Sequence, residues 1–221
     1  MRLLSWLKDT LWPRKLACLC CGYNSEGEFL CPTCRKALKA MKLSEAEQGD
    51  GHIRSVYRYD GIVKKLVYQL KMDCLIDAAE VFAKDMAEAL TDMKLPESTV
   101  LTWVTMPELR RKKRGVDHGC ELCEAVARQA GLPVRQLLVR AGNDHTQRGL
   151  NREKRLQNLT KSISCSSKID VPVVIIDDVL TTGATVSACA EALRNAGATQ
   201  VYALTASRVV LKRRYFQLWR G

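Results

Sequence analysis

Residues 173–185 read VVIIDDVLTTGAT, and this stretch decides the fold. Its first four residues are apolar and β-branched, which is typical of a buried strand in a parallel sheet. Two carboxylates follow at Asp177 and Asp178, and a loop of small and hydroxyl-bearing residues then leads into a helix predicted over 186–196. We therefore expect both acids just after a parallel strand, at the edge where open α/β sheets bind ligands.

The loop after the two acids is suited to an anion. Backbone N–H groups at a helix start, together with threonine hydroxyls, hold a phosphate group with the help of the helix dipole. The loop consists of Thr181, Thr182, Gly183, Ala184 and Thr185. It is not a Walker loop, because no lysine follows the glycine. Carboxylates bind a sugar diol directly or through a hydrated divalent cation, so the stretch predicts a ribose 5-phosphate ligand rather than a solvated acidic turn.

Strands and helices alternate along most of the chain. Apolar runs predict strands over 53–59, 100–106, 134–139, 171–176 and 201–205, and helical periodicity predicts helices over 62–70, 77–90, 120–130 and 186–196. Such alternation implies an α/β fold, with a mostly parallel sheet flanked by helices on both faces. Residues 44–52 are polar and are expected to form a linker or loop. We therefore predict an N-terminal module of residues 1–43, which includes a short helix, and a domain of residues 44–221.

Two closely spaced cysteine pairs lie in the N-terminal module. Cys18 and Cys21 form one C-x-x-C pair, and Cys31 and Cys34 form the second. Four thiolates from two such pairs can surround a tetrahedral ion, which predicts a closed, structural zinc site without catalytic function. Cys20 could replace Cys21 in the ligand set, and the alternative to zinc is four buried or disulfide-bonded cysteines.

A third pair has the same spacing but lies on a predicted helix. Cys120 and Cys123 have no partner pair, and we interpret them as core or surface thiols.

The chain of 221 residues carries a formal net charge of +11. This excess favours polyanionic or phosphorylated partners, although a solvated basic surface would give the same number. Five consecutive cations are expected to form a basic loop that meets pyrophosphate or a nucleic-acid backbone: Arg110, Arg111, Lys112, Lys113 and Arg114. The start of the chain lacks the features of a signal peptide, and no apolar run approaches the roughly 18 residues of a membrane span. We expect a cytoplasmic protein without stable membrane insertion.

VVIIDDVLTTGAT resembles the phosphoribosyl-pyrophosphate (PRPP) binding motif of type I phosphoribosyltransferases. Together with the cysteine pairs it resembles the ComF family, which combines an N-terminal zinc ribbon with a type I phosphoribosyltransferase-like domain. Two further blocks are similar to that family. They are the Y-x-G…L-K block from Tyr59 to Lys71 and the Q-x-x-L…R-x-x-N block at Gln147, Leu150, Arg155 and Asn158. The resemblance extends over nearly the whole chain.

The resemblance implies a role for each part of the motif. Asp177 and Asp178 would form the catalytic site and contact the ribose hydroxyls and Mg²⁺ of PRPP. The loop 181–185 would wrap the 5-phosphate, and Met106 and Pro107 match the position of the pyrophosphate-binding loop. The family's R-G-[FY]-N-Q block is replaced by RGVDH at 114–118, which alters the local contact. Its last residue, His118, is either a new acid or base or an ordinary surface or core histidine.

The resemblance also implies a biological context. ComF-type proteins act in natural competence and DNA uptake, so we expect PRPP and Mg²⁺ as ligands, with single-stranded DNA and other DNA-uptake proteins as further partners. Two alternatives remain open. The chain is an active phosphoribosyltransferase that displaces pyrophosphate in favour of an unknown acceptor, or it is a PRPP-sensing regulator without transfer activity. The nearest approach to a basic and aromatic patch is the tail LKRRYFQLWRG, residues 211–221.

Overall fold

The computed structural model describes residues 17–49, 51–73, 75–141 and 162–210. Several features noted in the sequence lie outside these ranges. They are the predicted N-terminal helix, the block at Gln147, Leu150, Arg155 and Asn158, and the tail 211–221.

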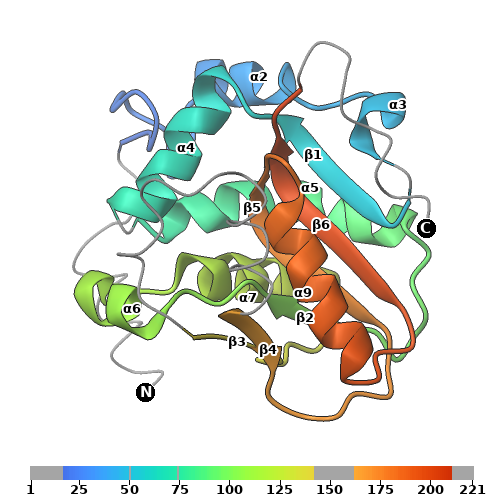
Figure 1. The fold of residues 1–221 in the computed structure, drawn as a ribbon. Coiled ribbons are helices and arrows are strands. Elements are labelled where there is room, and N and C mark those ends of the chain that lie inside the picture. Colours follow the sequence, from blue (N-terminus) through green and yellow to red (C-terminus); the bar gives the residue numbers. More distant parts are fainter. Residues whose placement is uncertain (1–16, 50, 74, 142–161, 211–221) are drawn as a thin grey trace.

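A four-stranded sheet forms the centre of the molecule. Its order is β1 (Ile53–Arg58), β6 (Val201–Arg208), β5 (Val173–Leu180) and β2 (Val100–Trp103), and all neighbours are parallel (Figure 1). The central strand β5 begins with four residues that are fully buried, as a strand covered on both faces requires. The predicted fold class, an α/β fold with a mostly parallel sheet flanked by helices, is confirmed.

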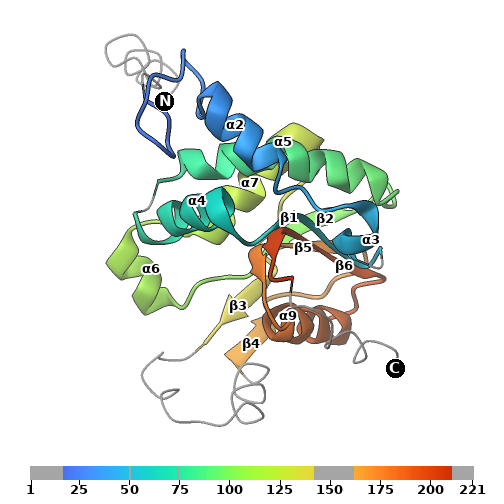
Figure 2. The same cartoon turned by 90° about the horizontal axis from the view of Figure 1, so that it is seen from above.

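Helices cover both faces of this sheet (Figure 2). The helices α4 (Gly61–Met72), α5 (Asp77–Asp92) and α7 (His118–Ala130) share one hydrophobic core with one face. On the other face, α9 (Ala184–Asn195) packs beside a small antiparallel pair, β3 (Leu138–Arg140) and β4 (Ile163–Cys165), around a second core. The four predicted helices therefore all form, each within a few residues of its expected bounds.

Several element boundaries differ from the sequence prediction. The strand β5 continues four residues beyond Ile176, whereas β2 ends at Trp103, three residues early. The strand predicted over 134–139 is reduced to one bridge between Val134 and Leu101, and β3 begins only at Leu138. Pairing with a neighbouring strand, which the sequence of one strand does not reveal, fixes these ends.

Two segments expected to be loops are partly helical. Within 44–52, α3 (Glu45–Gln48) forms behind a capping box in which Ser44 and Glu47 bond each other's backbone N–H groups. The basic run lies on α6 (Glu108–Arg114), which begins after Pro107 and ends at Gly115 in a left-handed conformation with φ of 75°. Arginine and lysine are good helix formers, and proline and glycine fit these two positions.

The cysteine-bearing segment packs directly on the α/β domain. Its helix α2 (Pro32–Lys39) buries Leu38, and Leu38 and Leu30 belong to the same core as α4 and α5. After α2, the backbone N–H of Leu43 donates a hydrogen bond of 2.9 Å to the carbonyl of Val56 in β1, so the end of this segment also contacts the sheet. A domain boundary between residues 43 and 44 stays a prediction. In the part of the chain that the structure describes, no helix combines the length and apolarity needed to cross a membrane.

Candidate functional site

The two adjacent acids lie where β5 extends past its neighbour. Pairing with β2 stops at Trp103 and Ile176, while pairing with β6 continues from Asp177, opposite Thr205, to Leu180. Asp177 and Asp178 therefore lie within the strand and not after it, contrary to the expectation that the strand ends at Ile176. They still lie at the carboxyl edge of the sheet, on the stretch of β5 that runs beyond the end of β2.

Asp178 is a buried carboxylate with two nitrogen neighbours. Its side chain is 4% exposed, and its Oδ1 lies 2.7 Å from Lys71 Nζ at the end of α4. Its Oδ2 lies 3.4 Å from His118 Nε2 at the start of α7. Among the described residues, Oδ2 of Asp178 and Nδ1 of His118 are buried without a hydrogen-bond partner. A buried carboxylate requires a paired charge, which Lys71 supplies here.

Asp177 has a different environment from its neighbour. Its Oδ1 accepts a hydrogen bond from the backbone N–H of Asp178 at 2.9 Å. Burial, and then the nearby Asp178 carboxylate, raise the pKa of Asp177 to about 7. Near neutral pH this carboxyl group can therefore both donate and accept hydrogen bonds, which suits a pair of hydroxyl groups. Burial also lowers the pKa of His118, which favours its neutral imidazole.

A chain of buried hydroxyl groups supports the strand beneath the two acids. Ser207 Oγ donates to the backbone carbonyl of Asp178 at 3.0 Å, and Thr205 Oγ1 donates to the carbonyl of Ser207 at 3.0 Å. Ser55 Oγ in β1 lies 2.7 Å from Thr205 Oγ1. These hydroxyls link three strands at the site edge and satisfy polar groups that would otherwise be costly to bury.

The loop after β5 makes a tight turn into α9. Gly183 is the residue before the helix and has φ of 78°, a conformation that glycine adopts without steric cost. Thr182 Oγ1 accepts a hydrogen bond from the N–H of Ala184 at 3.4 Å, and Thr181 and Thr182 are exposed. Exposed threonines beside the start of a 12-residue helix form the arrangement that binds phosphate groups in other proteins.

Asp117 fixes the segment that follows β2. Its Oδ2 accepts from the indole Nε1 of Trp103 at 3.3 Å and from the N–H of Met106 at 3.5 Å. Its Oδ1 accepts from the N–H groups of Gly119 and Cys120, so it also caps α7. Met106 and Pro107 are consequently held near the helix whose first residue, His118, reaches Asp178.

The basic run is an exposed helical surface. The side chains of Arg110, Arg111 and Lys112 on α6 are exposed, and Arg114 Nη2 lies 3.3 Å from the sulfur of Met72 at the end of α4. The run therefore lies beside the helix that carries Lys71, as a helix and not as the basic loop expected from the sequence.

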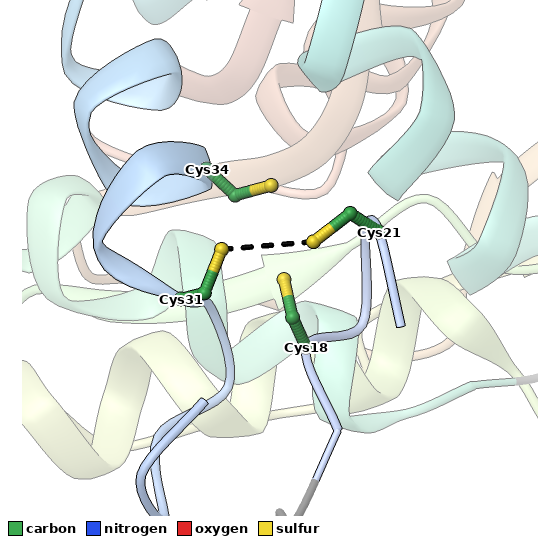
Figure 3. A group of neighbouring side chains, drawn as sticks. All are labelled: Cys18, Cys21, Cys31 and Cys34. Atoms are coloured by element: carbon green, nitrogen blue, oxygen red, sulfur yellow. Dashed lines mark hydrogen bonds between the residues drawn. The ribbon is translucent and has the colours of Figure 1, made fainter. Parts of the chain in front are cut away.

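The four paired cysteines form one cluster (Figure 3). The sulfurs of Cys18, Cys21, Cys31 and Cys34 all lie within 4.8 Å of one another, and the Sγ atoms of Cys21 and Cys31 are 3.6 Å apart. The structure thus places Cys21 in the group and leaves Cys20 out of it. These four sulfurs could hold a metal ion such as zinc, because they close around one point as tetrahedral thiolate sites do.

The thiols of the cluster differ among themselves. Burial opposes ionisation of Cys18, but hydrogen bonds from the backbone of Cys31, Cys21 and Cys20 lower the pKa of its thiol to about 6, whereas burial raises the pKa of Cys34. A thiolate is the form that binds metal. In the third cysteine pair, burial raises the pKa of Cys120 to about 12, and burial also raises that of Cys123. Cys123 is fully buried and Cys120 is partly exposed, which agrees with their interpretation as core or surface thiols of α7.

Three residues at this site were not predicted as site residues from the sequence. Lys71 ends the L-K block that supports the family resemblance, and its place at the end of an amphipathic helix was a second hint at a functional position. Asp117 lies in the segment 114–118 that departs from a family block, although nothing there indicated a helix cap, and Ser207 carried no signal beyond a polar side chain near the end of a predicted strand.

Comparison with curated proteins identifies relatives that are named for competence and for DNA utilization. The DNA utilization protein YhgH of Salmonella typhimurium is 32% identical over 164 residues, which cover 68% of this chain and 70% of that protein. Competence protein ComFC of Streptococcus pneumoniae is 27% identical over 196 residues, or 84% of this chain and 85% of that protein. Competence protein F of Haemophilus influenzae is 31% identical over 120 residues, so the match spans about half of that relative, 52%.

Family models and solved structures give less information about this chain than the curated relatives do. No family model matches the chain. The glutamine PRPP amidotransferase of Bacillus subtilis is 20% identical with a TM-score of 0.40, covering 59% of this chain and 26% of that one. A hypoxanthine phosphoribosyltransferase of Staphylococcus aureus is 14% identical with a TM-score of 0.35, covering 63% and 71%. Similarity this low assigns no ligand to the chain.

Proposed function

We propose that this chain, which belongs to the ComF family of competence proteins, binds PRPP at the carboxyl edge of its sheet and serves the uptake or utilisation of DNA. The domain has the α/β fold of phosphoribosyltransferase type that membership of this family implies. The relatives named for competence and for DNA utilization support the biological context.

One observation carries the ligand proposal. Asp177 lies at the open edge of β5, three further residues of the strand lead from there to the exposed Thr181 and Thr182, and α9 begins shortly after them at Ala184. In the proposed complex, Asp177 hydrogen-bonds the ribose hydroxyls, and the loop 181–185 together with the helix N-terminus binds the 5-phosphate. Met106 and Pro107 are proposed to face the pyrophosphate group. Mg²⁺ would arrive on that pyrophosphate group, for which it is a common partner.

Isothermal titration with PRPP and Mg²⁺ tests this assignment. We expect one site per chain, with binding weakened at least about tenfold by Asp177→Ala, since a hydrogen bond to a charged or strongly polar group contributes about 1.5 kcal/mol or more. Asp170→Ala, which removes an exposed acid, is the matched control and should bind like the parent. Equal heats from the parent and Asp177→Ala would refute the site. Pyrophosphate release in the presence of candidate acceptors would identify a transferase, and binding without release a sensor.

A second contact, with single-stranded DNA, is proposed at α6. Three neighbouring cations on this helix are exposed, which is the electrostatic requirement for binding a phosphate backbone. The proposal extends to a structural Zn²⁺ in the four-cysteine cluster, whose sulfurs all lie within 4.8 Å of one another.

A further inference from the structure

The buried acid of the pair faces a cation that the chain itself provides. Lys71 Nζ lies 2.7 Å from one oxygen of Asp178, and His118 Nε2 lies 3.4 Å from the other. The two nitrogen-bearing residues come from α4 and α7, on the helical layer that covers one face of the sheet. Both oxygens of Asp178 therefore face protein nitrogens, and the carboxylate itself is 4% exposed.

This geometry does not fit a magnesium ion held by Asp178. Mg²⁺ requires oxygen ligands in a nearly octahedral arrangement at about 2.0–2.1 Å, and it usually keeps several of its waters. An ion at Oδ1 would have to share that oxygen with the Lys71 ammonium, and two cations at one carboxylate oxygen repel each other strongly away from bulk water. An ion at Oδ2 would meet the imidazole of His118, and this oxygen is buried, whereas Mg²⁺ usually keeps several of its waters.

The ammonium group can do part of what a metal ion would do. It neutralises the Asp178 charge, and an ammonium has three N–H donors, of which Asp178 occupies one. Lys71 is 35% exposed, so the remaining donors are accessible from the open edge of the sheet. They can bind a ribose hydroxyl or a phosphate oxygen of a ligand placed against Asp177.

We propose that Lys71 takes the place of a protein-bound divalent cation at this site, so that the site binds a ribose phosphate without a metal ion held by Asp178. The part that concerns the ligand depends on the proposed function, whereas the exclusion of a metal ion from Asp178 does not. Lys71 acts as a positioning residue for Asp178 and as a determinant of the cation requirement.

A metal titration tests the exclusion without any sugar ligand. The full chain, with the metal of its cysteine cluster retained, is titrated with Mn²⁺ while the spin resonance signal of free Mn²⁺ is recorded. We expect no binding by the parent, and binding of one Mn²⁺ per chain by Lys71→Met, which keeps the aliphatic stem but removes the ammonium. Lys71→Gln should gain the site as well if the methionine variant does not fold. Lys71→Arg keeps the charge and should bind no Mn²⁺. The double variant Lys71→Met/Asp178→Asn should bind no Mn²⁺ either.

Two results of this titration would overturn the proposal. One is a parent chain that binds Mn²⁺ and loses it on Asp178→Asn, because the site would then already accept a metal ion. The other is a folded Lys71→Met or Lys71→Gln variant that gains no Mn²⁺, because the ammonium would then not be what excludes it.

A ligand titration tests the consequence for binding. Ribose 5-phosphate is used because it lacks the pyrophosphate that binds Mg²⁺ by itself, and metal-free buffer replaces a chelator, which would strip the cysteine cluster. The parent should bind equally with and without Mg²⁺, and Lys71→Met should bind about tenfold more weakly without Mg²⁺ and recover with it. A parent that requires Mg²⁺ would overturn the proposal. A parent that binds neither ribose 5-phosphate nor PRPP would instead refute the proposed function, and the Mn²⁺ titration would still decide the role of Lys71.

Discussion

The side-chain amide of Gln69 donates a hydrogen bond of 2.7 Å to the backbone carbonyl of Leu19. Leu19 lies between two cysteines of the four-cysteine cluster, and Gln69 lies in the last turn of α4, two residues before Lys71. Cys18 and Leu30 belong to the same hydrophobic core as Val67 and Leu70 of α4. The cysteine loop is thus joined, by one bond and one shared core, to the helix that places a cation at the strand edge.

We expect Gln69→Ala to destabilise the protein by about 1 kcal/mol, because the Leu19 carbonyl loses its donor at a partly buried position. Urea denaturation of the two chains measures the difference. Gln129→Ala, an exposed substitution of the same type on α7, is the control and should change the free energy of unfolding by less than about 0.5 kcal/mol. Equal losses in the two variants would mean that the bond to Leu19 contributes nothing.

Removal of the cluster metal should loosen residues 17–43 first and the end of α4 next. A closed four-sulfur site stabilises a small segment largely through its metal, and here the segment shares a core with α4. Hydrogen exchange before and after chelation measures this order, and the zinc content of the purified chain gives the expected ratio of one ion per chain. Cys31→Ser should lose the ion, whereas Cys20→Ser should keep it, because Cys20 lies outside the cluster. Loss of the ion in both variants would contradict the assignment of Cys21.

The motif of the central strand and the cysteine spacing account for what the sequence could predict. Four β-branched residues followed by two acids and a small-residue loop identify a parallel strand and its functional end, and the paired C-x-x-C spacing predicts a cluster that the structure confirms as a set of adjacent sulfurs. Both signals are local: the residues that make the feature are close together in the chain, so periodicity and spacing are sufficient to recognise it.

The remaining features depend on contacts between distant segments. The strand β5 continues through two acids because β6 pairs with it, and no property of residues 177–180 alone favours four more residues of strand. Lys71 is 107 positions before Asp178 and is brought to it by helix packing. The sequence predicts a basic loop here because the run follows the turn after the strand 100–106, although Pro107 and Gly115 at its ends are ordinary helix boundary residues that indicate a helix.

Asp117→Ala should destabilise the chain by about 1–2 kcal/mol, because it removes the cap of α7 as well as the acceptor of the Trp103 indole. Asp117→Asn, which keeps an acceptor oxygen and restores the residue of the family block, should cost about 0.5 kcal/mol or less. Chemical denaturation separates the two values. An alanine variant as stable as the asparagine variant would show that the cap contributes little.

Tyr57 should make the folded state sensitive to alkaline pH. Burial, and then its hydrogen bond to Asp85, raise the pKa of its phenol far above the ordinary value of 10.0. Above pH 10 the phenol of Tyr57 loses its proton in the unfolded chain but keeps it in the folded chain. The stability due to Tyr57 is therefore fully present below pH 10 and falls as the pH rises above 10. The loss is up to about 1.4 kcal/mol per pH unit. Tyr57→Phe should remove this part of the slope, measured as the free energy of unfolding between pH 8 and pH 11. Parallel curves for the parent and the variant would contradict it.

Binding of single-stranded DNA through α6 predicts a specific dependence on salt. Each phosphate contact contributes a slope of about −0.7 to the plot of log affinity against log salt for a single strand, because binding releases a condensed counterion. The double variant Arg111→Gln/Lys112→Gln should therefore reduce the magnitude of the slope by about 1.4 and weaken binding most at low salt. The variant Lys36→Gln/Lys39→Gln removes two exposed charges from α2, with the same change in net charge, and should leave the slope closer to that of the parent. If both variants reduce the slope equally, the DNA responds to net charge alone, and α6 is not the binding surface.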